Sequence, residues 1–83
     1  MKIRITACDI AVKQKNTDII DLAKGKREYT LYFFKNPVLV KTKIGLHDVT
    51  AGDCILIAPG FPHYIKSKGE QWNYDSLAFK GSD

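Results

Sequence analysis

The 83-residue sequence has few of the residues that usually reveal a protein's chemistry. It contains two cysteines, Cys8 and Cys54, together with two histidines, one methionine and one tryptophan. The cysteines are far apart and form no CxxC or Cys/His spacing, which excludes a disulfide framework and a zinc motif and predicts two buried thiols in a reducing compartment. The longest apolar runs, such as residues 54–59, are far shorter than the ~20 residues that span a bilayer, and no signal-peptide core precedes them. We therefore expect a cytoplasmic protein.

Positive charge is present but not concentrated. Thirteen Lys and Arg against nine Asp and Glu give a net charge of +4, and the basic residues are spread along the whole chain. Nucleic-acid-binding segments usually cluster such residues, so we expect no direct DNA binding by this part of the protein. The glycines form neither GxGxxG nor GxxxxGK, so no phosphate-binding loop is indicated.

What the sequence does contain is a regular succession of short apolar runs and turn signals, which predicts an all-β fold. Residues 17–25 are compatible with a short capped helix or with an extended segment, and we predict the extended form. Residues 29–34 carry aromatic side chains on both faces, as in a strand that is buried on both sides or in a dimer seam. Further strands are predicted at 3–12, with a slip near Asp9 typical of a bulge, and at 38–43, 54–58, 63–66 and 71–79.

Three blocks of this sequence resemble the N-terminal sensor domain of AraC-family transcription regulators. Residues 52–63 resemble the second cupin motif, in which a Gly-Asp turn, an apolar strand, a Pro-Gly corner and a histidine follow one another. Residues 72–81 resemble the strand that closes the sensor barrel, and residues 27–34 precede both blocks in the family's order. The resemblance covers roughly residues 17–81. It implies a cupin-like jelly-roll barrel, incomplete at its C-terminal end.

The sequence departs from the family pattern where cupin enzymes carry their metal ligands. The His-x-His pair of the first cupin motif should fall near residues 34–47, and it is absent. His63 with His47 falls short of the three protein ligands that a catalytic metal normally needs, so we expect no metal and no cofactor. Leu22 stands where many sugar-sensing relatives have an arginine, and Ser76 and Ala78 where they have an aromatic residue or histidine, which implies a less polar pocket.

The predicted ligand site lies on two successive strands. If these strands pair, one face carries five residues: His63, Ile65, Trp72, Tyr74 and Ser76. For His63 the alternative is a polar strand start that bonds the adjacent loop, and for Trp72 and Tyr74 it is an ordinary place in the core. No base stands near Cys54 or Ser76 in the sequence, so a nucleophilic enzyme is not indicated.

We therefore predict that residues 1–83 form a single, truncated sensor and dimerisation domain rather than an enzyme. The resemblance implies that the helix-turn-helix DNA-binding domain follows outside these residues, and that a small molecule, with sugars among the candidates, controls it. A chain of this size has a thin core and benefits from a partner, so we expect a homodimer or higher oligomer that pairs or exchanges strands. The alternative is a stand-alone small cupin, either an enzyme or a carbohydrate-binding protein.

Overall fold

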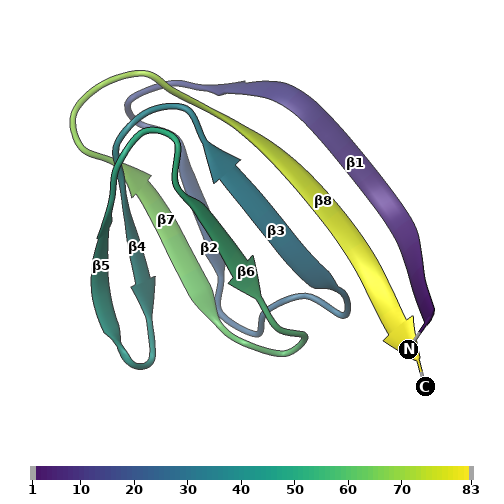
Figure 1. Cartoon of the computed structure of the whole chain (residues 1–83). Helices are drawn as coiled ribbons and strands as arrows, with labels where there is room; N and C mark the ends of the chain where they lie inside the picture. The colour runs from purple at the N-terminus through teal and green to yellow at the C-terminus, as the bar shows by residue number, and fades with distance from the viewer. Residues whose placement is uncertain (1, 83) are drawn as a thin grey trace.

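Two antiparallel four-stranded sheets face each other in the computed structural model, which describes residues 2–82 (Figure 1). Sheet A has the strand order β1-β8-β3-β6, and sheet B has the order β2-β7-β4-β5. The strands of sheet A are β1 (Lys2–Gln14), β3 (Tyr29–Phe34), β6 (Cys54–Ile57) and β8 (Trp72–Ser82). Those of sheet B are β2 (Ile19–Leu22), β4 (Val38–Thr42), β5 (Gly45–Val49) and β7 (His63–Ser67). The predicted all-β fold is confirmed, including the extended form of residues 19–22.

The core lies between the sheets and is built from alternate residues of each strand, because successive side chains of a strand point to opposite faces. On β3, Thr30, Tyr32 and Phe34 are buried, whereas Phe33 between them is 44% exposed. Of the two predicted alternatives for this strand, burial on both sides within one chain is therefore wrong, and a place in a dimer seam stays a prediction. Eight large buried side chains form the core cluster: Tyr32, Phe34, Val38, Val40, Val49, Ile57, Ile65 and Trp72.

The long strand β8 lies in the middle of sheet A, between β1 and β3. Within residues 2–82, the strands at free edges are β1 and β6 in sheet A and β2 and β5 in sheet B, so each sheet has two strands with a neighbour on one side alone. The two sheets are not joined by strand pairing, so the barrel is not closed. The predicted slip near Asp9 is confirmed as a β-bulge at which Ala11 has φ 55° and donates its N–H to Asp75 Oδ1 at 2.7 Å.

The expectation that both cysteines are buried is wrong. Cys8 and Cys54 are free and exposed rather than buried. The reason is their register: Cys8 is level with Leu77 and Cys54 with Phe33, on the face of sheet A that points away from the core.

Between Lys2 and Ser82 no helix is long and apolar enough to cross a membrane.

Candidate functional site

The buried imidazole of His63 is the centre of the polar groups inside the fold. His63 begins β7, is 2% exposed and has a partner at each ring nitrogen. Nδ1 lies 3.1 Å from the carbonyl oxygen of Phe61, and a carbonyl only accepts, so Nδ1 carries the proton. In the neutral ring Nε2 is then an acceptor. It accepts a hydrogen bond from the Tyr32 hydroxyl group, whose oxygen lies 3.2 Å away. This pairing joins β7 of sheet B to β3 of sheet A.

Tyr32 is held in the protonated state that this hydrogen bond requires. Burial, with a further contribution from Tyr74, raises the pKa of Tyr32 to about 12. The phenol therefore remains a donor throughout the neutral range. The Tyr32 ring also packs edge-on against His63 and Tyr74, with centroid separations of 5.7 Å in both pairs.

The loop before β7 is fixed by close packing against residues 25 and 26. The Gly60 N–H donates to the Lys26 carbonyl at 2.8 Å. Gly25 has φ +71°, and a Cβ at this position would lie 2.7 Å from the Phe61 nitrogen. Only glycine fits so close an approach, and the result is a fixed position for the Phe61 carbonyl that orients His63.

A hollow of about 310 Å³ opens beside this group, between β4 and β5 of sheet B and β6 of sheet A. Its polar lining is Thr42 and His47, whose Oγ1 and Nε2 atoms are 3.2 Å apart. Thr42 is also level with His63 in the pairing of β4 with β7. The rest of the lining is apolar: Val40, Ile44, Ile55, Leu56, Ile57 and Phe61. Thr42 and Phe61 thus connect the hollow, which we call the mouth, to the buried His63.

The structure rearranges the predicted site. Strands β7 and β8 belong to different sheets and do not pair, so the five predicted residues do not form one row. Tyr74 contacts Tyr32, and Ser76 is level with Tyr32 on the neighbouring strand, so both reach the His63 group through that residue. Ile65 and Trp72 are fully buried core residues, and Trp72 stacks on Tyr74 at 5.5 Å.

Sequence reasoning missed Tyr32, Thr42 and Phe61. Tyr32 alternates with Thr30 and Phe34, which is the one signal that could have placed it on an inward face. Two buried polar atoms near these residues have no hydrogen-bond partner, Thr30 Oγ1 on the same face of β3 and Trp72 Nε1 at the start of β8. Buried polar atoms normally have partners, so these two have unused capacity for a bound molecule or water.

No group of three or more His, Cys, Asp or Glu side chains within residues 2–82 is placed to hold a metal ion. Both ring nitrogens of His63 are already engaged in hydrogen bonds, and Nε2 of His47 faces Thr42. The site is therefore a hydrogen-bonding site lined by hydroxyl groups, imidazoles and apolar side chains.

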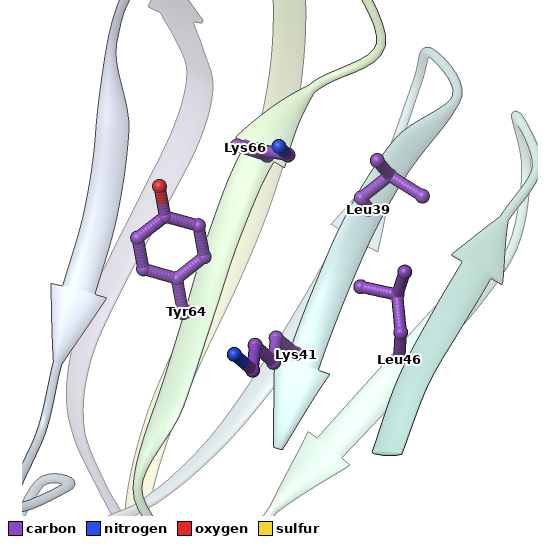
Figure 2. Close-up of a pocket in the computed structure, with 5 residues that line it drawn as sticks. All are labelled: Leu39, Lys41, Leu46, Tyr64 and Lys66. Atoms are coloured by element: carbon purple, nitrogen blue, oxygen red, sulfur yellow. The ribbon is translucent and has the colours of Figure 1, made fainter.

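A second hollow, of about 720 Å³, lies on the outer face of sheet B and is separate from the His63 group. Figure 2 shows its five lining residues, which come from β4, β5 and β7: Leu39, Lys41, Leu46, Tyr64 and Lys66. Register places them on the side of the strands opposite Val40, Ile65 and the core. The hollow is an open depression in the surface of a sheet.

Comparison with solved structures identifies the fold. The plu4264 protein from Photorhabdus luminescens matches with a TM-score of 0.67 and 14% identity over 84% of this chain and 58% of that one, so this chain spans less than two thirds of its length. A cupin domain from Bordetella pertussis Tohama I matches with a TM-score of 0.50 and 13% identity over 86% of this chain and 94% of that one. The predicted cupin-like fold is confirmed by this likeness. No protein-family model matches the sequence, and no curated protein matches it either.

Proposed function

We propose that this chain is a ligand-binding cupin module that senses a small, uncharged, hydroxylated molecule. The observation that supports this proposal is the nearness of two hydrogen-bonded pairs, His47 with Thr42 at the mouth and His63 with Tyr32 in the interior. They adjoin where Thr42 is level with His63 on the neighbouring strand. Ligand sites are mostly apolar hollows with a few convergent polar groups, and the mouth has this composition. Its lining contains no charged side chain, which favours a neutral ligand, with sugars among the candidates.

Each part of the site has a distinct role in this proposal. Thr42 and His47 exchange a hydrogen bond that a ligand hydroxyl can replace or extend at the mouth. Phe61 supplies an aromatic wall, with the Lys43 ammonium group over its ring at 5.2 Å from the ring centre. Thr30 Oγ1 is buried without a hydrogen-bond partner, and Thr30 is level with Ile57, which lines the mouth.

The sensing role belongs to a cytoplasmic regulator of the AraC type in this proposal, with DNA contacted by a domain outside residues 1–83. The support is the resemblance of residues 27–34, 52–63 and 72–81 to the family's sensor domain and the dispersed positive charge of the chain. The alternative is a small cupin that acts alone as an enzyme or a carbohydrate-binding protein. The sequence of the gene beyond Asp83 separates them, because two helix-turn-helix patterns would support the regulator.

Nuclear magnetic resonance titration tests the ligand site directly. We would add neutral pentoses, hexoses and their polyols to the isotope-labelled chain and expect amide shifts at Thr42, His47 and Phe61. Thr42→Val should weaken binding about 10-fold, the effect of losing one hydrogen bond worth about 1.4 kcal/mol. Tyr64→Phe, which removes a hydroxyl from the outer face of sheet B, is the matched control and should bind normally.

Two results would contradict the proposed ligand class or site. One is the absence of binding by every neutral compound of the panel at tens of millimolar. The other is a set of shifts confined to the hollow around Leu39 and Tyr64, which would place the ligand on the outer face of sheet B.

A further inference from the structure

Apolar side chains from all four strands lie on the outer face of sheet A. Rows of side chains cross the sheet on this side, as the register shows. Ile5 is level with Phe79 and Tyr29, and Cys8 with Leu77. Leu77 is in turn level with Leu31, which pairs with Leu56. An antiparallel sheet in a two-layer sandwich normally presents polar side chains to water on its outer face.

Nothing else in residues 2–82 covers these side chains. Ile3 and Ile5 are each 61% exposed, Leu56 is 56% exposed and Phe33 is 44% exposed. The N-terminal strand β1 extends the sheet at its edge by pairing with β8 rather than folding across its face (Figure 1). We call the surface formed by Ile3, Ile5, Tyr29, Leu31, Phe33, Leu56, Leu77 and Phe79 the A face.

The A face is electrically neutral. None of its eight residues is charged. Beside it on the same side of sheet A, Asp75 is level with Phe33 and lies 3.5 Å from the Lys35 ammonium group, and Lys13 is level with Asn73. The net charge of +4 would oppose the approach of two copies through most of their surface, but this face adds little to that repulsion. A flat, uncharged, apolar surface is complementary to itself.

The area of the A face is sufficient for a weak homodimer. Four exposed side chains at about 100 Å² each and four half-buried ones at about 40 Å² each give roughly 600 Å² of apolar surface. Pairing two copies would bury about 1,200 Å² in total, which is at the lower limit for specific interfaces and favours a weak association.

We propose that two copies of this chain dimerise by packing their A faces together, sheet on sheet, with a two-fold axis through the contact. Each copy contributes the same patch, as a closed two-fold interface requires. The sheets would lie about 10 Å apart with their strands rotated by about 30°, the usual geometry of stacked sheets. This contact shares Leu56 with the mouth, and it uses outward-facing side chains rather than the backbone groups of the free strand edges.

Sedimentation or light scattering across a concentration series tests the dimer. We expect a mass near 9.4 kDa at about 1 μM and nearly twice that mass at several hundred micromolar. Ile5→Lys and Phe33→Lys should each weaken association at least 10-fold, because they bury a charge in the interface. Ile19→Lys and Leu46→Lys are matched controls, since these residues are 51% and 63% exposed on sheet B and each change adds the same charge.

The two free cysteines provide a second measurement on the unmodified chain. Cys8 and Cys54 lie on the A-face side of sheet A and are exposed in one copy. Their rate of reaction with a thiol reagent should fall as the protein concentration rises, and Phe33→Lys should abolish this dependence. This readout holds even if Ile5→Lys fails to fold, which circular dichroism would reveal.

Three outcomes would overturn the proposal. The first is a 9.4 kDa mass at several hundred micromolar, which would leave the A face to another segment or protein. The second is a dimer that survives all four lysine changes, which would indicate pairing through strand edges. The third is equal weakening by the sheet A and sheet B variants. Ile5 and Phe33 do not line the mouth, so failure here leaves the ligand-binding proposal untouched.

Discussion

Replacing Tyr32 with phenylalanine removes one oxygen atom from the centre of the fold and leaves the ring in place. The deleted hydroxyl is the donor to Nε2 of His63. In the variant, Nε2 becomes a buried acceptor without a partner, because Nδ1 still bonds the Phe61 carbonyl. Leaving a buried polar group unsatisfied costs about 1–3 kcal/mol, so we expect Tyr32→Phe to lower the free energy of unfolding by about 2 kcal/mol at pH 7.

The same substitution should have a smaller effect in alkali. The pKa of Tyr32 in the folded chain is about 12, above the ordinary value of 10.0, because burial disfavours the phenolate. The stability linked to this proton is complete below pH 10 and is lost as the pH rises toward 12, since the unfolded chain releases the proton first. By pH 11 this linkage removes about 1.4 kcal/mol from the wild type and nothing from the phenylalanine variant. The difference in free energy of unfolding between the wild type and Tyr32→Phe should therefore be about 1.4 kcal/mol smaller at pH 11 than at pH 7.

Urea unfolding at pH 7 and pH 11 measures both quantities. Trp72 is the single tryptophan and is fully buried, so its fluorescence reports the transition. The free energy of unfolding of the whole chain should be about 4–12 kcal/mol, so the variant should still fold after the expected loss. Tyr64→Phe is the control, with an expected change within about 0.5 kcal/mol at pH 7. A gap that stays the same at both pH values, or a Tyr32→Phe variant as stable as the wild type at pH 7, would refute this account of the His63 pair.

Three further outcomes follow from the turns and the histidines. Gly25→Ala should destabilise the chain by about 2 kcal/mol more than Gly60→Ala in thermal or urea unfolding. The two glycines have nearly equal positive φ angles, but only the Cβ at Gly25 would collide with Phe61, and equal losses would contradict the steric argument. The hydrogen bonds from Thr50 hold the pKa of Asp53 below its usual value. The wild type should therefore be more stable than Asp53→Ala at pH 7, and this difference should disappear as the pH falls below about 4. A difference that persists at pH 2 would count against this cause. Elemental analysis after dialysis against a weak chelator should find no stoichiometric zinc, iron or manganese, and one bound equivalent would revive a metal enzyme.

Most of the strands could be predicted from the sequence because their signals are local, whereas β5 was not predicted. Alternation in residues 63–66 and the Pro-Gly corner before them place His63 at a strand start, and the polar slip near Asp9 marks the bulge. The turn residues between the strands are equally local.

Sheet membership could not be predicted in the same way. The connection from Ser67 to Trp72 is short enough for a hairpin, yet it carries the chain from sheet B to sheet A. For this reason the expected row of His63 with Trp72 did not form. Tyr32 was not predicted as a site residue because its strand carries aromatic side chains on both faces. The packing of sheet B distinguishes the inward residues Tyr32 and Phe34 from Phe33 on the A face.

The central position of β8 also determines when this chain can fold. Lys2 pairs with Ser82, and β8 is the only strand that connects β1 with β3. β3 can pair with β6 earlier, but sheet A cannot be completed until β8, the last of the eight strands to be synthesised, has left the ribosome. Until then β1 has no partner, and the apolar residues of β3 are exposed in an incomplete sheet. Pairings so distant in sequence form slowly, so we expect sheet A to fold on a timescale of milliseconds to seconds once β8 is available, with aggregation as its main competitor.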